Sequence, residues 1–235
     1  MVKLGNTKAI CGILGTVVDD KDDGEALETQ VEFVGGSTSS RDVIREKKVA
    51  GAVLGDWITG LVRKWVDVER LVAVGGKLRW RLKVVVYVME DDGAVEDVTV
   101  LAVVAALKDA RLPTIALKED EENIIEKEEE VEEKYEEAVA VASADRMLTL
   151  GIGGFSVAMS FVIFDGRLLI DPTKEEEGVA NGKFTLVFSS GNSLQSVKKS
   201  GGVPLSDSLL EKATEQGQAR ATEMLQALES STNSY

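Results

Sequence analysis

A single stretch, residues 77–113, constrains the fold of this chain more than any other part of its sequence. It opens with KLRWRLKVVVYVMED, where alternating residues give way to a continuous apolar run, a pattern typical of a strand that passes from a sheet edge into a core. The almost wholly apolar run Val98–Leu107 follows, with Asp97 as a candidate helix cap and Pro113 as a stop signal. We therefore expect a long strand, a tight turn and a buried helix.

The turn between this strand and this helix is strongly acidic. Backbone N–H groups at the start of a helix, together with the helix dipole, form a natural site for an anion such as phosphate. Around this helix start, however, lie Asp91, Asp92, Glu96 and Asp97, whose carboxylates would repel a phosphate. The sequence thus raises the question of whether an anion site has been lost here or never existed.

Composition removes several classes of chemistry. The chain of 235 residues contains no histidine, which excludes Ser-His-Asp and Cys-His catalysis and most zinc sites. Its one cysteine, Cys11, lies in the apolar run KAICGIL and is expected to be a small core residue rather than a nucleophile. A single cysteine cannot form an internal disulfide, which fits a reducing compartment. The formal net charge of −14 argues against independent binding to nucleic acid or to an anionic membrane.

The sequence before residue 77 predicts a hairpin and helices. VKLGNTKAICGIL predicts a hairpin with its turn at Gly5–Asn6, which leaves one edge of its sheet unprotected. Residues 19–29 predict an acidic loop, and residues 31–40 predict an irregular Gly/Ser-rich segment. Residues 42–66 carry apolar residues at helical spacing and predict one or two helices. Three glycines either weaken this helix or permit close packing, and both interpretations stay open: Gly51, Gly55 and Gly60.

A charge run and then mostly strands follow residue 118. Residues 119–137 are rich in glutamate and predict a solvated helix or a disordered insert. Two hairpins are expected, one turning at Asp165–Gly166 and one around residues 190–192. An amphipathic helix with a Ser/Asp cap covers residues 206–228. The whole pattern indicates an α+β fold.

The charge run also divides the expected fold. Residues 1–118 are predicted to form the first part of the core, and residues 138–235 the second part with the C-terminal helix. No stretch of the sequence reaches the length and apolarity of a membrane span. We therefore expect no membrane partner.

Four segments spread over most of the chain form a recognisable set. They are VKLGNTKAICGI, DDGAVEDVTVLAVVAALKDARLP, SFVIFDGRLLIDPTKEEE and the VKKSGG before the terminal helix. In this order they resemble the RNase PH-like subunits of the RNA exosome, and LIDPTKEEE and AVVAALKDARLP suggest the ribosomal RNA-processing protein 43 type. The resemblance implies an RNase PH-like fold of the ribosomal protein S5 domain 2-like β-α-β class. Family members normally begin with a further strand and helix, so we expect the N-terminal part to be truncated.

The resemblance also bears on the acidic turn. It implies that active members cut RNA from its 3′ end with inorganic phosphate, which a D-G-G-[ST]-R loop before a helix holds. Here that loop begins at Asp92 and continues as Gly93, Ala94, Val95 and Glu96. The arginine that would grip the phosphate is thus replaced by a carboxylate, and we interpret the loop as a degenerate phosphate loop.

The acidic positions of active members are changed as well. The resemblance places them near Asn181 and Lys183, which supply neither a general acid nor a ligand for Mg²⁺. The nearby run Glu175–Glu177 is expected to be a solvated loop rather than a metal cluster. We therefore expect no catalytic residue, no metal and no cofactor.

Basic residues concentrate at two places. Arg63 and Lys64 are candidates for RNA contact, although a helix end that faces solvent is the simpler interpretation. The row Arg79, Arg81 and Lys83 is interpreted in the same way, as a strand that faces solvent. The resemblance implies channel arginines in related subunits at two positions that are apolar here: Ile58 and Leu61.

These features predict a non-catalytic structural subunit of the eukaryotic RNA exosome, which supports 3′-to-5′ RNA processing and degradation, including rRNA maturation and mRNA turnover. The resemblance implies a six-membered ring of homologous subunits, S1/KH-type cap subunits and RNA in the ring channel. It also implies a location in the nucleus, nucleolus and cytoplasm. Two alternatives stay open: an active phosphorolytic 3′-to-5′ exoribonuclease subunit, or a subunit that lends basic residues to a partner's composite active site.

Overall fold

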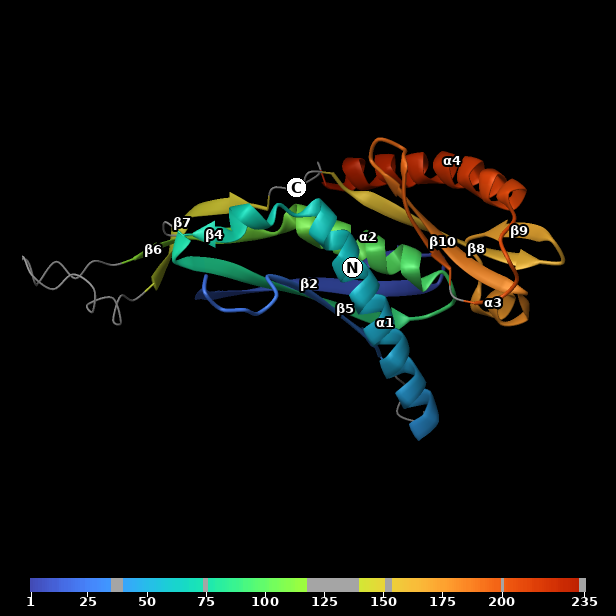
Figure 1. Cartoon of the computed structure of the whole chain (residues 1–235), viewed down its shortest axis with the longest axis horizontal. Coiled ribbons are helices and arrows are strands. Elements are labelled where there is room, and N and C mark those ends of the chain that lie inside the picture. The colour runs from blue at the N-terminus through green and yellow to red at the C-terminus, as the bar shows by residue number, and fades with distance from the viewer. Residues whose placement is uncertain (35–39, 74–75, 118–139, 151–153, 200, 233–235) are drawn as a thin grey trace, which may run out of the picture.

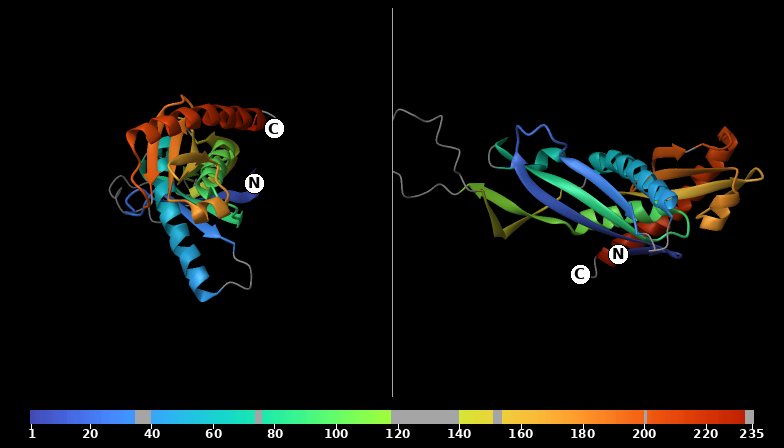
Figure 2. Two further views of the ribbon diagram at one scale, coloured as in Figure 1. Left: turned by 90° about the vertical axis from the view of Figure 1, so that its right-hand side faces the viewer. Right: turned by 90° about the horizontal axis from the view of Figure 1, so that it is seen from below.

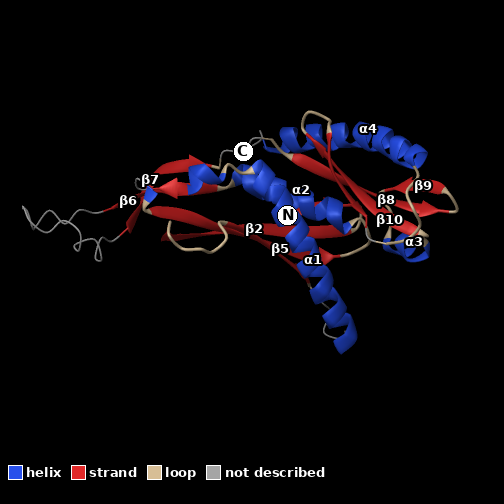
Figure 3. Ribbon diagram, in the orientation of Figure 1, coloured by secondary structure: helices blue, strands red, loops and turns tan. Residues whose placement is uncertain are grey.

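The computed structural model describes residues 1–34, 40–73, 76–117, 140–150, 154–199 and 201–232. These residues form an α+β arrangement in which two main β-sheets are joined by a helix, α2, that packs against both (Figures 1 and 3). The acidic segment 119–137 lies outside the described residues, so its prediction as an exposed insert stays a prediction. None of the described helices is long and apolar enough to cross a membrane.

The first sheet has the strand order β1-β2-β5-β3, with the short β4 also on β5. Its strands are β1 (Val2–Leu4), β2 (Thr7–Asp19), β3 (Leu27–Phe33), β4 (Val72–Ala73, after the 3₁₀ turn Val68–Leu71) and β5 (Leu78–Glu90). β5 pairs with β2 antiparallel along almost its whole length and buries alternate residues such as Leu82 and Val86. The long strand predicted at residues 77–91 is therefore confirmed, as is the turn at Gly5–Asn6.

The prediction of loops across residues 19–40 is wrong for β3. This strand runs parallel to β5, from Leu27 opposite Leu82 to Phe33 opposite Val88. Leu27, Thr29 and Val31 face the core, which is the alternation expected of a strand with one buried face. The acidic loop is real but ends before this strand begins.

Residues 41–65 form one continuous helix, α1 (Arg41–Trp65), that lies along the free edge of β3. A Cβ at Gly51 or Gly55 would overlap the carbonyl oxygens of Val31 and Thr29, so these two glycines permit the close approach. The Thr29 N–H donates a hydrogen bond to Thr59 Oγ1 at 2.9 Å. The close-packing interpretation is thus confirmed for this glycine pair. The start of α1 projects away from both sheets (Figure 2).

The predicted buried helix is α2 (Val95–Asp109), and apolar side chains surround it on nearly every side. Val100 and Val103 are fully buried, because α2 packs against β2 and β5 on one side and β8 on the other. The helix ends at Asp109. Pro113, predicted to end it, lies instead in an unpredicted strand, β6 (Arg111–Leu117), which pairs with β7 (Ala140–Thr149).

The second main sheet has the order β11-β10-β8-β9, and α4 (Asp207–Thr232) covers one face of it (Figure 1). Its strands are β8 (Ser156–Phe164), β9 (Arg167–Ile170), β10 (Gly182–Ser189) and β11 (Leu194–Lys199). Both predicted hairpins are confirmed. At the first turn, Asp165 and Gly166 have φ of 47° and 72°, as a tight two-residue turn requires. An unpredicted short helix, α3 (Lys174–Val179), joins β9 to β10.

Candidate functional site

The acidic turn ends in two residues with left-handed backbone conformations. Gly93 has a φ of 96° and Ala94 a φ of 45°, and α2 begins directly after them at Val95. The N-cap of α2 is therefore Ala94, whose side chain cannot accept a hydrogen bond. The prediction that Asp97 caps this helix is wrong, because Asp97 lies within the first helical turn and bonds to a strand of the other sheet.

Residues from both halves of the chain hold this turn in place. Thr7 Oγ1 accepts a hydrogen bond from the Asp92 N–H at 2.9 Å and donates one to the Gly93 carbonyl oxygen at 2.8 Å. From the other half, the Lys174 N–H donates to the Asp92 carbonyl oxygen at 2.9 Å. A Cβ at Gly93 would overlap the Pro172 carbonyl oxygen, so close packing as well as φ requires glycine here.

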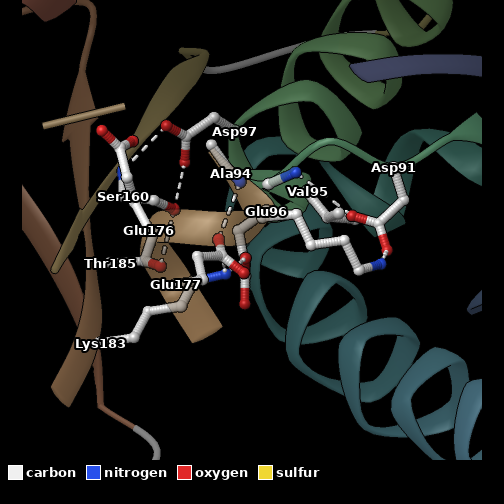
Figure 4. Close-up of polar contacts among 12 residues, drawn as sticks. Asp91, Ala94, Val95, Glu96, Asp97, Ser160, Glu176, Glu177, Lys183 and Thr185 are labelled. Carbon is white, nitrogen blue, oxygen red and sulfur yellow. Dashed lines mark hydrogen bonds and ion pairs between the residues drawn. The ribbon is translucent and has the colours of Figure 1, made fainter. Parts of the chain in front are cut away.

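The Glu177 carboxylate occupies the start of α2 (Figure 4). Its Oε1 accepts a hydrogen bond from the Ala94 N–H at 2.9 Å and lies 2.7 Å from Lys183 Nζ. A free N–H at a helix start is where an external anion would bind. In this chain, a side chain of the protein itself takes that position.

The helix that carries Glu177, α3, is short but capped at its start. Thr173 Oγ1 accepts a hydrogen bond from the Glu176 N–H, and the Glu176 carboxylate accepts one from the Thr173 N–H at 2.8 Å. Lys174 also pairs with Asp91 of the acidic turn. The expectation of a solvated loop here is therefore wrong, because capping and pairing fix the first turn of α3 against the start of α2.

Glu96 is enclosed by two lysines. Its carboxylate lies 2.8 Å from Lys183 Nζ and 3.0 Å from Lys198 Nζ, and only 15% of the Glu96 side chain is exposed. Burial by itself raises the pKa of the Glu96 carboxyl, but the charges of both lysines outweigh burial and lower that pKa to about 2. Burial lowers the pKa of Lys183, whereas Glu96 and Glu177 raise it by more, so its net pKa is raised. Lys198 also lies over the Trp57 ring, 4.8 Å from its centroid.

A cavity of about 340 Å³ opens beside this cluster. Its apolar lining comes from α1, Phe33 and Val95, and its charged lining comes from the acidic turn, the start of α2, α3, β10 and β11. Each lysine of the lining is paired with a carboxylate: Lys174 with Asp91, Lys183 with Glu96 and Glu177, and Lys198 with Glu96. The positive charges of these lysines are thus balanced by carboxylates of the chain itself, without an external anion. Among the described residues, no three acidic, histidine or cysteine side chains are grouped as ligands for a metal ion.

Asp97 ties the first turn of α2 to the second sheet. Its two carboxylate oxygens accept hydrogen bonds from the Ser160 N–H at 2.8 Å and from Ser160 Oγ at 2.6 Å (Figure 4). Ser160 Oγ lies a further 3.1 Å from Thr185 Oγ1. Burial raises the pKa of Asp97, and the Ser160 hydrogen bonds offset only part of that effect. With 3% of its surface exposed, Asp97 has a structural position rather than one that a substrate reaches.

The two positions expected to replace the acidic residues of active members are separated in space. Lys183 joins Glu96 in the cluster, whereas Asn181 Oδ1 accepts a hydrogen bond from the Asp165 N–H at 3.0 Å in the β8–β9 turn. Val95, the third residue of the degenerate loop, is buried in the core. Of the predicted site residues, Ala94, Glu96 and Lys183 therefore meet around one point.

The basic residues lie elsewhere. In the last turn of α1, Arg63 pairs with Glu25 at 2.7 Å and Lys64 is exposed. Ile58 and Leu61 are buried, so neither position faces solvent. The row on β5 is paired with acidic residues: Arg79 with Asp20, Arg81 with Asp22, and Lys83 with Glu28.

Glu177 and Lys198 are absent from the predicted site. Their partners are distant in sequence, since 83 residues separate Glu177 from Ala94 and 102 separate Lys198 from Glu96. The position of Lys198 near Lys183, however, could have been inferred from the sequence. The β10–β11 hairpin pairs Thr185 with Lys198, which puts Lys198 on the same sheet face as Lys183.

Comparison with known families identifies the fold. Residues 1–113 match the model of the 3′ exoribonuclease family, domain 1, and residues 154–220 match domain 2 of that family. The two matches together span well over half of the chain, and the chain belongs to this family. The RNase PH-like fold expected from the sequence is thereby confirmed.

The chain's relatives are components of exosomes. The exosome complex component Rrp42 of Thermococcus onnurineus is 26% identical over 218 residues, which is 86% of this chain and 69% of that protein. Rrp42 of Pyrococcus furiosus is 27% identical over 244 residues, which is 100% of this chain and 81% of that protein. RRP45 of Danio rerio is 27% identical over 144 residues, covering 60% of this chain and 33% of RRP45. The finer assignment to the protein 43 type stays a prediction.

Solved structures share the fold. A chain described as the archaeal exosome core superposes with a TM-score of 0.69 at 20% identity, covering 97% of this chain and 79% of that chain. A chain described as the Archaeoglobus fulgidus exosome with RNA bound to the active site superposes with a TM-score of 0.71, also at 20% identity. That match covers 96% of this chain and 80% of the other chain. The architecture of the two sheets and α2 is therefore that of exosome core subunits.

Proposed function

We propose that this chain is a non-catalytic subunit of an RNA exosome core ring and that it acts by assembly with homologous RNase PH-like subunits. One observation carries the proposal. At the start of α2, where a phosphorolytic enzyme needs positive charge for phosphate, Glu96 and Glu177 supply two carboxylates already paired with lysines. Family membership and relatives named as exosome components support the assembly.

Electrostatics argue against phosphate binding at this point. A phosphate at the Ala94 N–H would have to displace the Glu177 carboxylate and would approach Glu96. Like charges about 4 Å apart repel by about 4 kcal/mol at an effective dielectric constant near 20. Because Lys183 and Lys198 are already paired, no lysine of the cluster is left to offset that repulsion. The alternative of an active phosphorolytic subunit is therefore disfavoured.

Exposed apolar surface supports an assembled state. Val43, Ile44, Val49 and Val53 of α1 are between 40% and 58% exposed, and the start of α1 projects away from the body (Figure 2). β1 pairs only with residues 7–9 of β2, and no described strand pairs with the same edge of β2 beyond them. Permanent subunit interfaces commonly bury more than about 2,000 Å² of largely apolar surface. Because α1 lies at the β3 side of the first sheet and this free edge at the β1 side, two neighbouring homologous subunits, one on each side, would remove both features.

The wider setting of the proposal follows from the resemblance seen in the sequence. We assign the chain to a eukaryotic exosome with S1/KH-type cap subunits and RNA in the ring channel. There it supports rRNA maturation and mRNA turnover in the nucleus, nucleolus and cytoplasm. Co-localisation of the tagged full chain with an exosome cap subunit tests this assignment. Exclusion of the chain from the nucleus would contradict it.

An activity assay tests the absence of catalysis. The purified full chain is incubated with labelled poly(A), inorganic phosphate and Mg²⁺, beside an active RNase PH-family enzyme as a positive control. We expect no shortening of the RNA by this chain. Phosphate-dependent shortening that is lost when residues of the acidic turn are substituted would contradict the proposal.

The remaining alternative, a composite active site, is tested in the same assay. In a purified pair with a catalytically active homologous subunit, Arg63→Ala/Lys64→Ala is compared with Lys212→Ala/Arg220→Ala. Both double variants remove two positive charges from exposed positions of a helix, and the control positions lie on α4, away from α1. We expect equal phosphate turnover from both, because Arg63 is paired with Glu25. Selective loss with the Arg63/Lys64 variant would favour the composite site.

A further inference from the structure

The contact between Glu177 and the start of α2 joins two parts of the chain that match different domains of the family. Ala94 lies in the segment that matches domain 1, and Glu177 in the segment that matches domain 2. The Ala94 N–H donates to Glu177 Oε1 at 2.9 Å, and Lys183 Nζ lies 2.7 Å from the same oxygen. We propose that Glu177 is an internal ligand, which fills the anion site at the start of α2 and closes it against phosphate.

The backbone around Ala94 is arranged to receive an anion. Its left-handed conformation precedes the first turn of α2, so its N–H has no partner within the helix and needs an acceptor from elsewhere. The helix dipole adds a partial positive charge at the same place. The methyl side chain of Ala94 cannot accept a hydrogen bond from this N–H. A carboxylate is therefore the natural acceptor, and Glu177 supplies it.

The position of Glu177 is fixed before any ligand could compete. The capping box of Thr173 and Glu176 sets the direction of α3, and the Lys174 N–H ties α3 to the Asp92 carbonyl oxygen at 2.9 Å. Only 21% of the Glu177 side chain is exposed. Because α3 already holds the Glu177 carboxylate in place, little conformational entropy is lost when it accepts the hydrogen bond from the Ala94 N–H. It therefore competes strongly with a free anion for that N–H.

Lys183 is also paired with carboxylates of the chain, so it does not attract a free anion to the start of α2. Lys183 contacts Glu177 and Glu96 at once, and Lys198 holds Glu96 from the other side. Removal of Glu177 leaves the Ala94 N–H without an acceptor and Lys183 with one carboxylate instead of two. The vacated space adjoins the cavity of about 340 Å³, which gives a small anion a path to the N–H. An inorganic phosphate is the expected replacement, because it offers several acceptor oxygens to one N–H and one lysine.

The test compares Glu177→Ala with Glu175→Ala in the full chain, since both remove one negative charge from the same short helix and Glu175 is exposed. Melting curves are recorded in inorganic phosphate and in sodium chloride of equal ionic strength. We expect Glu177→Ala to melt about 3–8 °C below Glu175→Ala in chloride and to regain much of that loss in phosphate. Wild type and Glu175→Ala should show no phosphate-specific gain.

A phosphate titration followed at the Ala94 amide signal by NMR locates the binding. Glu177→Ala, or the double variant Glu96→Gln/Glu177→Ala, should shift this signal with a dissociation constant on the order of millimolar. Glu96→Gln alone should not shift it. Equal phosphate binding by wild type would overturn the inference, as would no binding by either variant that lacks Glu177. The inference concerns side chains of this chain alone, so it stands or falls independently of assembly into a ring.

Discussion

Glu96 makes a contribution to stability whose pH dependence is set by its two lysine partners. Its pKa is about 2 in the folded chain, against an ordinary value of 4.5. A lowered folded-state pKa means that the contribution is fully present above pH 4.5 and is lost as the pH falls toward 2. This difference between the folded-state pKa of Glu96 and its ordinary pKa corresponds to about 3 kcal/mol of folding free energy at neutral pH. Asp97 acts in the opposite direction, because its pKa is raised by burial.

We predict that Glu96→Gln lowers the free energy of unfolding by about 2–3 kcal/mol at pH 7, since Lys183 and Lys198 lose a buried charged partner. The difference from wild type should shrink as the pH falls from 5 toward 2. Urea unfolding of both proteins across this range measures it. A difference that stays constant with pH would show that Glu96 contributes through packing rather than through charge.

At the scale of elements, the approach of α1 to β3 depends on two glycines. A Cβ at Gly51 or Gly55 would overlap a carbonyl oxygen of β3, whereas Gly60 on the same helix has open space around it. We predict that Gly51→Ala or Gly55→Ala destabilises the fold by about 1–3 kcal/mol, because the helix must move off the strand. Gly60→Ala should stabilise by up to about 1 kcal/mol, since alanine favours a helix. The midpoints of urea unfolding measure the stability changes of all three variants. Equal changes for Gly55→Ala and Gly60→Ala would contradict the close packing of α1 on β3.

The elements that the sequence predicted well have strong local patterns. β5 and α2 were predictable because their apolar runs are long, and the β8–β9 hairpin because Asp165–Gly166 suits only a tight turn. β3 was missed although Leu27, Thr29, Val31 and Phe33 alternate, because flanking acidic and glycine residues dominate that region. β6 was missed because it contains Pro113, which is rarely found in strands.

The candidate site was only half predictable, for a physical reason. The acidic turn is a local feature of the chain and could be found in its residues, and the resemblance to RNase PH-like subunits implied that Ala94 and Glu96 lie in a degenerate phosphate loop. Glu177 could not be singled out, since it is one of three consecutive glutamates and only the capping of α3 turns it toward Ala94. Contacts between residues this far apart in sequence depend on how the two sheets pack against α2.

At the scale of the whole molecule, large apolar side chains are exposed on both α1 and the first sheet. Besides the start of α1, the first sheet leaves Leu14 60% exposed, with Ile10 and Tyr87 also exposed nearby. Exposed apolar strands of this kind promote aggregation. The net charge of −14 opposes precipitation by self-repulsion, so the lone chain should form soluble oligomers. Covering this surface by a homologous subunit would stabilise both partners.

The central claim, that the chain works by assembly into a ring of RNase PH-like subunits, is tested most directly by the mass of the native complex. The full chain is affinity-purified from its own cells, and native mass spectrometry is followed by identification of the co-purified proteins. We predict a six-membered ring that contains this chain and homologous subunits, and light scattering should show oligomers when the chain is expressed alone. Recovery of a monodisperse monomer that melts cooperatively and brings down no RNase PH-like protein would contradict the account.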